Sequence, residues 1–345
     1  MIKSHHLYQE DLERILQVEG KERLAGKSFL LTGATGMVGT CLVDALMKFN
    51  QNEQAGITIY AIGRSRDRAA LRLGEYFSSE LFHFIEQDVR DPLPASINAD
   101  YIIPLASHTH PVAYSRYPVE TVEINVKGAE NALKKAVACG ATVLYPSSVE
   151  IYGNGDDVFT EEYTGKLNLA TARACYTESK RVSEALCQSY IAEYGLVCKI
   201  VRLSRLFGPT MLMSDTKASS QFILKALAGE DIVLKSKGNQ LFSYTYVPDA
   251  VQAMLFVLLH GACGQAYNVA SETCNVRLAD FAFKCAALAG RSVSFDLPSE
   301  MEAKGYSIAT KAVLCTKRLS DLGWESSYSF EDALGRTYKI LAGLT

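Results

Sequence analysis

Short apolar runs alternate along the first two thirds of the chain with longer stretches in which apolar residues recur every three or four positions. The runs occupy residues 28–31, 57–62, 82–85, 99–107, 142–146 and 197–203, and each is short enough for one buried strand. Between them, residues 41–47, 119–140 and 176–195 carry helical spacing, and Gly195 provides a C-cap for the last stretch. The alternation predicts an α/β fold in which helices cover both faces of a doubly wound parallel sheet.

The pattern changes on either side of this region. Residues 1–26 indicate a polar helical extension with a ragged apolar stripe, to which we assign no chemistry. After residue 206 polar loops become more frequent, although residues 244–260 again predict a strand and a helix. We therefore expect three parts: the extension over 1–26, an α/β domain over 27–206 that 244–260 joins, and a smaller C-terminal α/β region over 207–345.

A glycine-rich turn, Thr32-Gly33-Ala34-Thr35-Gly36-Met37-Val38-Gly39, connects the first predicted strand to the first helix. In this context Gly33 permits a tight turn, Gly36 lets the backbone approach a pyrophosphate, and Gly39 lets the helix pack on the strand. The turn predicts a Rossmann-type NAD(P)-binding domain, with an ordinary βα turn as the alternative. The residues expected at the cofactor are Gly33, Thr35, Gly36, Met37, Val38 and Gly39.

The end of the second predicted strand, where an adenosine ribose is read, carries Arg64 and Arg66 and no acid. An acid there accepts from the 2′-hydroxyl of NAD, whereas arginine suits the 2′-phosphate of NADP or stacks on adenine. We expect NAD as cofactor, and the two arginines make NADP the alternative. If they are solvated turn residues instead, they do not distinguish the two cofactors. The ends of the next strands add Asp88, Val89, Leu105, Ala106 and Ser107 as expected cofactor contacts.

Two histidines, His108 and His110, follow the fourth predicted strand at its carboxyl end, where open α/β sheets bind ligands. They are candidate substrate contacts together with Ser107. Local hydrogen bonds within the loop are the alternative interpretation. We expect no metal site, because no third ligand lies nearby in the sequence.

Tyr176 and Lys180 lie four residues apart at the start of a predicted helix, so both side chains project from one face. A neighbouring ammonium lowers the pKa of a phenol, which can then take a proton from a substrate hydroxyl while hydride leaves the same carbon for nicotinamide. Ser148, at the end of the fifth predicted strand, is placed to hold the same substrate oxygen. The spacing alone occurs by chance; its combination with the glycine turn makes it informative.

Glu150 follows Ser148 by two residues. Oxidation of a sugar hydroxyl to a ketone acidifies the neighbouring C–H bond, and a nearby carboxylate can remove that proton so that water is eliminated. A β-keto acid formed in the same way loses carbon dioxide instead. Glu150 therefore indicates a lyase, with a hydrogen-bonding role in the pocket wall as the alternative.

Together these residues resemble the extended short-chain dehydrogenase/reductase family, and within it the NAD-dependent nucleotide-sugar epimerases and dehydratases. The resemblance spans residues 27–340 and is nearest to the UDP-glucuronate decarboxylases (UDP-xylose synthases). It rests on residues 118–121, 125–128, 172–176, 180–184, 207–209, 221–223, 246–249 and 322–324. It implies that Ser148, Glu150, Tyr176 and Lys180 are catalytic, and that residues 207–345 bind a nucleotide-sugar substrate.

The sequence departs from this family at several positions. Val149 stands where the hexose 4,6-dehydratases carry an aspartate, the expected general acid for the leaving hydroxyl. Phe242 and Thr210 stand where the family has arginine, and an aromatic side chain does not replace a bidentate guanidinium. Arg205, in contrast, adds a positive charge where the decarboxylases have a small polar residue. The expected substrate contacts are Ser107, His108, His110, Ser148, Arg173, Arg205 and Phe242.

These observations favour an NAD(P)-dependent lyase, a decarboxylase or dehydratase, that transiently oxidises C4 of a nucleotide sugar in surface polysaccharide or sugar-nucleotide biosynthesis. A nucleotide-sugar 4-epimerase, an isomerase of the same fold, is the first alternative. An NADPH-dependent ketoreductase, favoured by Arg64, and a sensor that binds NAD(P) without turnover are the others. The intact Tyr176 and Lys180 argue against the sensor, because a pure binder does not need a reactive phenol.

The composition narrows the remaining choices. The formal net charge of −3 argues against a nucleic-acid partner. The apolar runs are far shorter than the roughly 18 residues of a membrane helix, and the chain does not begin with a signal-peptide pattern, so we expect no membrane partner. Nine scattered cysteines without a Cys-x-x-Cys pair indicate free thiols in the cytoplasm. The family resemblance implies a homodimer in which helices over 118–138 and 176–194 form a four-helix interface.

Overall fold

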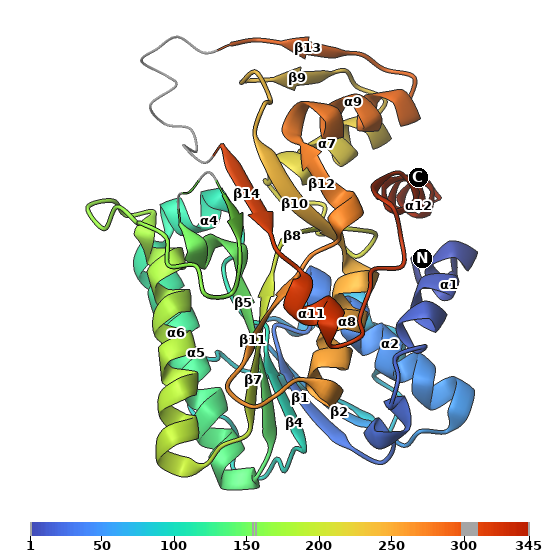
Figure 1. The fold of residues 1–345 in the computed structure, drawn as a ribbon. Helices are drawn as coiled ribbons and strands as arrows, with labels where there is room; N and C mark the ends of the chain where they lie inside the picture. The colour runs from blue at the N-terminus through green and yellow to red at the C-terminus, as the bar shows by residue number, and fades with distance from the viewer. Residues whose placement is uncertain (1, 154, 156, 298–309, 344–345) are drawn as a thin grey trace.

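The central sheet of the computed structural model contains seven parallel strands in the order β11-β7-β5-β4-β1-β2-β3 (Figure 1). The structure describes residues 2–153, 155, 157–297 and 310–343. The strands are β1 (Ser28–Thr32), β2 (Thr58–Gly63), β3 (Phe82–Glu86), β4 (Tyr101–Pro104), β5 (Thr142–Ser148), β7 (Cys198–Leu203) and β11 (Ala266–Val269). The strand order reverses at β1, between β4 and β2, and ligands of open α/β sheets bind at the carboxyl ends beside such a point.

Helices cover both faces of this sheet, which confirms the predicted fold class. On one face lie α1 (His6–Ile15), α2 (Met37–Glu53) and α8 (Val247–His260), and on the other lie α5 (Pro118–Cys139) and α6 (Ala174–Tyr194) (Figure 1). Successive strand residues alternate between the two layers, so that Leu31 packs with α2 and α8 whereas Leu30 packs with α5 and α6. Shorter helices are α3 (Arg66–Leu73), α4 (Pro111–Arg116) and α11 (Lys317–Asp321).

A second, smaller α/β region lies beyond the carboxyl ends of the central strands (Figure 1). Its main sheet contains β6 (Val158–Phe159), β8 (Arg205–Phe207), β10 (Leu241–Tyr246), β12 (Asn275–Arg277) and β14 (Lys311–Leu314). A separate pair is formed by β9 (Ile232–Leu234) and β13 (Val293–Phe295), and the helices are α7 (Ala218–Leu227), α9 (Leu278–Leu288) and α12 (Phe330–Ala342). Its core is aromatic: the rings of Phe207 and Phe330 both pack edge-on near Phe281.

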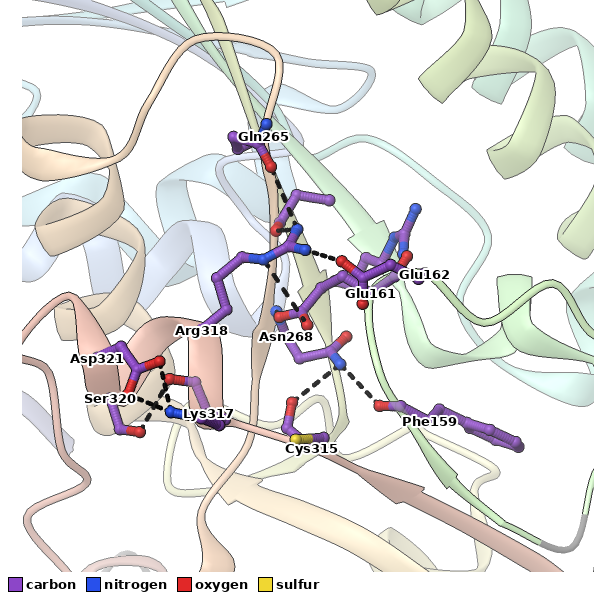
Figure 2. Close-up of polar contacts among 12 residues, drawn as sticks. Phe159, Glu161, Glu162, Gln265, Asn268, Cys315, Lys317, Arg318, Ser320 and Asp321 are labelled. Carbon is purple, nitrogen blue, oxygen red and sulfur yellow. Dashed lines mark hydrogen bonds and ion pairs between the residues drawn. The ribbon is translucent and has the colours of Figure 1, made fainter.

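Polar contacts around Asn268 join the two regions (Figure 2). The buried Asn268 side chain on β11 donates to the carbonyl oxygens of Phe159 at 2.9 Å and Cys315 at 3.0 Å, and accepts from the Tyr152 hydroxyl at 2.6 Å. Arg318 on α11 adds a hydrogen bond to the Ala266 carbonyl oxygen at 2.9 Å. These contacts fix the chain on either side of β6 and β14 against the edge strand of the central sheet.

Two strands belong to a different sheet from the one expected. Residues 244–246 were expected to join the 27–206 domain, but they belong to β10 of the second sheet, and only α8 packs on the central sheet. Conversely, β11 from the 207–345 region forms an edge of the central sheet, where it pairs with β7. Local sequence does not show which of two sheets a short apolar strand joins, because pairing is decided by tertiary contacts.

The N-terminal extension was expected to be a polar helix, but part of its polar surface is buried. Asp11 and Tyr8 on α1 are fully buried, and Tyr8 donates to the buried Asp44 carboxylate on α2 at 2.8 Å. Asp11 accepts from Tyr246 at 2.6 Å and from Arg336 at 2.9 Å, so α1 contacts both regions. Within the described residues, none of the helices is long and apolar enough to cross a membrane.

Candidate active site

A cavity of about 1140 Å³ lies at the carboxyl ends of the central strands and is lined by residues of both regions. The glycine turn after β1 lines one part of it, and β9, β10 and the start of α7 line another. Its volume exceeds the upper end of the usual range for one small ligand, roughly 1,000 Å³, and suits a dinucleotide together with a substrate. Every predicted cofactor and substrate residue lines this cavity: Gly33, Thr35, Gly36, Met37, Val38, Gly39, Arg64, Asp88, Val89, Leu105, Ala106, Ser107, His108, His110, Ser148, Glu150, Arg173, Tyr176, Lys180, Arg205 and Phe242.

The glycine turn is too crowded for side chains. Gly33 has φ +68°, and a Cβ there would lie 2.7 Å from the Ala106 backbone nitrogen. A Cβ on Gly39 would lie 2.5 Å from the Gly33 carbonyl oxygen. Gly36 is the N-cap of α2, whose first N–H groups therefore open onto the cavity. This cradle fits the pyrophosphate of a dinucleotide, because backbone donors and a helix dipole converge on it.

The adenosine end of the cavity is rich in ion pairs. Arg64 pairs with Glu120 on α5, and its side chain is half-exposed. Asp88 accepts from Arg90 at 2.8 Å, and this hydrogen bond holds the pKa of the Asp88 carboxyl below its usual range. Arg64 therefore already has a partner, which the sequence does not show, although its side chain still lines the cavity.

Tyr176 and Lys180 lie on one face of α6, as their spacing predicts. Lys180 is buried and donates to the Pro146 carbonyl oxygen at 2.8 Å, and burial lowers its pKa to about 8. Burial raises the pKa of Tyr176, the Glu150 charge raises it further, and a hydrogen bond with Ser148 opposes this shift. The expected lowering of the phenol pKa by the lysine is therefore not found in the chain alone: burial dominates, and the group that lowers this pKa is Ser148.

Ser148 ends β5 and begins the short 3₁₀ turn that contains Glu150. The Ser148 hydroxyl accepts from the Glu150 backbone N–H at 3.2 Å, and it also contacts the Tyr176 phenol. The turn brings Glu150 over the same part of the cavity. The structure thus brings together all four residues that the sequence assigns to the chemistry.

The Glu150 carboxylate lies between two guanidinium groups. Arg205 on β8 donates to Glu150 Oε1 at 3.1 Å, and Arg173 at the start of α6 lies 3.6 Å from Oε2. The Arg205 guanidinium also stacks on the Phe242 ring, 3.8 Å from its centroid. Residue 242, where the resemblance expects an arginine, is therefore a phenylalanine whose ring is in contact with the guanidinium of Arg205.

Sequence reasoning missed Tyr114. Tyr114 is on α4, and its ring stacks on that of Tyr176 with 5.5 Å between the centroids. The Arg173 guanidinium lies 5.5 Å from the centroid of the Tyr114 ring. Tyr114 is buried and lines the cavity. The sequence carries no local signal for this contact, since α4 and α6 are separated by some sixty residues and meet only in the folded chain.

The hydrogen bonds of the two histidines reach residues outside their own loop. His108 Nδ1 lies 3.1 Å from the Thr121 hydroxyl, and burial lowers the His108 pKa. His110 Nδ1 lies 3.3 Å from the Thr216 hydroxyl of the second region. Both rings line the cavity, and both have hydrogen-bond partners in other segments of the chain.

Thr210, the other position where the family has arginine, has a structural role here. It is buried and donates from its hydroxyl to the Met37 carbonyl oxygen at 2.8 Å, while its own carbonyl accepts from Arg72 at 2.6 Å. The second region is thereby attached to the glycine turn. Thr210 is absent from the cavity lining, so it is not a substitute for a substrate-binding arginine.

The fold and the site together define a dinucleotide-dependent enzyme of the short-chain dehydrogenase/reductase type. Residues 29–270 match the NAD dependent epimerase/dehydratase family, and the chain belongs to that family, whose cofactor is NAD. It is 32% identical over 312 residues to UDP-glucuronic acid decarboxylase 1 of Xenopus tropicalis, covering 90% of this chain and 71% of the relative. It is 36% identical over 229 residues to UDP-glucuronic acid decarboxylase 6 of Arabidopsis thaliana, covering 66% of this chain and 64% of the relative.

Solved structures show the same fold. A UDP-glucose 4-epimerase from Thermotoga maritima, in complex with UDP-glucose, superposes with a TM-score of 0.79 at 20% identity, covering 92% of this chain and 99% of that one. A dTDP-glucose 4,6-dehydratase from Bacillus anthracis, in complex with NAD, superposes with a TM-score of 0.74 at 18% identity, covering 91% and 96%. At these identities the comparison establishes the architecture alone.

Proposed function

We propose that this chain is a nucleotide-sugar lyase that oxidises C4 of its substrate transiently and then releases carbon dioxide. The observation that carries the proposal is the position of Glu150. It follows Ser148 by two residues, its backbone N–H donates to the Ser148 hydroxyl, and its carboxylate is held by Arg173 and Arg205. The relatives at 32% and 36% identity are named as UDP-glucuronic acid decarboxylases, which supports a hexuronic acid nucleotide as substrate.

In the first step Tyr176 accepts the proton of the substrate's C4 hydroxyl while the C4 hydrogen leaves as hydride. Bound NAD⁺ supplies the hydride acceptor and a positive ring charge, which opposes the burial that raises the Tyr176 pKa. Lys180 lies on the same face of α6 as Tyr176, and Ser148, which contacts the phenol, holds the substrate oxygen through its hydroxyl.

A C4 ketone makes the C5 carboxylate a β-keto acid. The bond from C5 to the carboxyl carbon then breaks, its electron pair moves toward the C4 oxygen, and carbon dioxide leaves. Glu150, after taking a proton from solvent, donates it to C5. Return of the hydride to C4 and return of the Tyr176 proton to the C4 oxygen complete the sequence. Ser148 and Tyr176 stabilise the developing negative charge on the C4 oxygen as hydrogen-bond donors.

Decarboxylation is favoured over dehydration because the residue beside Glu150 is the buried Val149, which offers no proton to a leaving hydroxyl. A 4-epimerase of the same fold is the competing function. The ketoreductase and the sensor are the further alternatives.

The experiment is incubation of the NAD-loaded protein with UDP-, dTDP-, CDP- and GDP-sugars, followed by mass spectrometry. A lyase product has lost carbon dioxide, or water if dehydration occurs, whereas an epimerase product keeps its mass and changes its sugar NMR spectrum. We expect Glu150→Gln to suppress product formation by about 10²-fold or more while reduced cofactor still forms. Unchanged turnover in Glu150→Gln contradicts the proposal.

We also propose a cytoplasmic homodimer. The helices α5 and α6 lie side by side on the outside of the sheet (Figure 1) and expose Val119, Val122 and Val182 to solvent. A second copy that buries these valines against its own α5 and α6 would form the four-helix interface that the resemblance implies. Sedimentation analysis of the purified chain tests this assembly, and a monomer at all concentrations contradicts it.

The cytoplasmic location is supported by the cysteines. All nine cysteines are free thiols, which is typical of a reducing compartment.

A further inference from the structure

Strand pairing in the second sheet puts an arginine beside the aromatic residue of the neighbouring strand. Arg205 on β8 is opposite Tyr244 on β10, two residues along the strand from Phe242, so Phe242 and Tyr244 face the same side. The Arg205 guanidinium lies 3.8 Å from the Phe242 ring centroid, and its charge helps to limit the rise of the Tyr244 pKa to about 12. A cation thus lies beside Phe242 although residue 242 itself carries none.

Two contacts fix the orientation of this guanidinium. The Phe242 ring covers one of its faces, and Glu150 Oε1 accepts from Nη2 at 3.1 Å. An arginine held by stacking and by an ion pair has lost most of its side-chain freedom before any ligand arrives. Little further ordering is needed when it binds another group.

The second terminal nitrogen of Arg205 has no such partner. Nη1 is buried, and among the described residues it has no hydrogen-bond acceptor. A buried, unpaired guanidinium N–H is costly, and native proteins rarely leave one unless a ligand or water completes it. Arg205 lines the cavity with 22% of its side-chain surface exposed, so a substrate oxygen can reach the accessible part of this guanidinium.

The charge of the surroundings selects an anion. Arg173 and Arg205 both face the single Glu150 carboxylate, which leaves excess positive charge in this part of the cavity. Glu150 is joined through its backbone N–H to Ser148, whose hydroxyl contacts Tyr176. An anionic oxygen bound at Arg205 therefore lies on the sugar, near the carbon that Tyr176 oxidises.

We infer that Arg205 is the residue that selects a substrate with a carboxylate on the sugar ring, with Phe242 and Glu150 as the groups that orient it. This inference rests on the proposed function, because it names the substrate class of the same site. The resemblance expects the arginine on β10, at residue 242. The inference instead assigns the selection of the sugar carboxylate to Arg205 on β8. The sugar carboxylate and the diphosphate of the nucleotide are the two anions that the experiment must separate.

The test measures the affinity of the full chain for UDP, UDP-glucose and UDP-glucuronic acid by titration calorimetry, with NADH bound in place of NAD so that the sugar is not oxidised during the titration. We expect the unchanged protein to bind UDP-glucuronic acid about 10-fold or more tighter than UDP-glucose. Arg205→Gln should weaken binding of UDP-glucuronic acid by about 10- to 100-fold and change the other two affinities by less than about threefold. Arg277→Gln is the matched control, since Arg277 is exposed on β12, on the other side of β10, and should leave all three affinities unchanged.

Arg205→Lys keeps the charge and provides a second variant if Arg205→Gln does not fold. It should fall between the unchanged protein and Arg205→Gln, because an ammonium cannot contact Glu150 and the substrate with a planar fork. Equal losses for all three ligands would assign Arg205 to the diphosphate and overturn the inference. So would an equal affinity of the unchanged protein for the glucose and glucuronic acid nucleotides.

Formation of bound NADH on mixing with either sugar nucleotide is recorded in parallel samples of the same variants loaded with NAD. If NADH forms but Arg205→Gln keeps the preference for UDP-glucuronic acid, the inference fails and the proposed function stands. If no ligand binds and no NADH forms, both fail.

Discussion

At the scale of single residues, the proposed chemistry depends on how easily the Tyr176 phenol loses its proton. Burial raises its pKa, and the negative charge of Glu150 raises it further. The same carboxylate that supports the lyase proposal therefore works against the first proton transfer. Arg173 and Arg205, which pair with Glu150, reduce this effect.

The charge of Glu150 leads to a prediction on pH dependence. Glu150→Gln removes a negative charge that disfavours the phenolate, so the pKa of Tyr176 should fall. Because the phenolate is the proton acceptor, the rate of hydride transfer rises with pH until Tyr176 is ionised. We expect the rising limb of the pH profile to move to lower pH in Glu150→Gln. Single-turnover NADH formation at a series of pH values measures this, and a profile moved to higher pH would refute the assignment.

How much of the site the sequence predicts depends on whether the contact is local. Tyr176 and Lys180 share one helix, so their spacing alone places them on one face, as found. The stacking of Tyr114 on Tyr176 and of Arg205 on Phe242 joins elements far apart in the chain. Residue type and periodicity do not encode such pairs, because they follow from how α4, α6, β8 and β10 pack.

At the scale of elements, the glycine turn between β1 and α2 is the part most tightly constrained by its neighbours. A Cβ on Gly33 or Gly39 would lie within 2.8 Å of backbone atoms, so substitution there disturbs the fold itself. Gly36 is different, because a Cβ there would meet only the Gly33 carbonyl oxygen at 3.2 Å. It is therefore the position at which cofactor approach can be separated from folding.

Gly36→Ala should weaken NAD binding by about 10-fold or more, because the added methyl group keeps the pyrophosphate from the backbone donors. Its thermal midpoint should fall by only a few degrees, as expected for about 1 kcal/mol or less. Fluorescence titration with NADH and thermal unfolding measure the two effects. Gly335→Ala on α12 is the control: a Cβ there has nothing within 4 Å, so NAD binding should not change. Unaltered NAD affinity in Gly36→Ala would remove the turn from the cofactor site.

The sheets show where prediction from the sequence ends. Each parallel strand of the central sheet up to β7 was predicted from its apolar run, since burial on both faces leaves a clear signal. Neither the joining of β11 to that sheet nor the membership of β10 in the second sheet could be predicted, because both depend on pairing with distant strands. For β11, the buried hydrogen bonds of Asn268 are among the tertiary contacts that hold the strand in place.

Asn268→Ala should lower the free energy of unfolding by about 2–4 kcal/mol, because it leaves the Tyr152 hydroxyl and two carbonyl oxygens without their buried partner. Chemical denaturation measures the loss. Lys317→Gln in the same neighbourhood (Figure 2) removes only an exposed pair with Asp321 and should cost less than about 1 kcal/mol. Equal costs for the two variants would show that Asn268 does not hold the regions together.

At the scale of the whole molecule, two α/β regions enclose one cavity, and each contributes a different part of the reaction. The region of the central sheet and its covering helices supplies the glycine turn, Ser148, Tyr176 and Lys180, whereas the second region contributes Arg205 and Phe242. Under the proposed function, hydride chemistry and substrate selection are thus carried by separate structural units. Substitutions in one unit should change the cofactor reaction, and substitutions in the other should change which sugar is accepted.

The central claim is that Tyr176 allows a substrate carbon to pass its hydrogen to bound NAD. The most direct measurement is stopped-flow absorbance of the NAD-loaded protein after mixing with UDP-glucuronic acid. The account predicts transient NADH formation in the unchanged protein and a reduction of its rate by about 10³-fold or more in Tyr176→Phe. NADH formation at an undiminished rate in Tyr176→Phe would contradict the account.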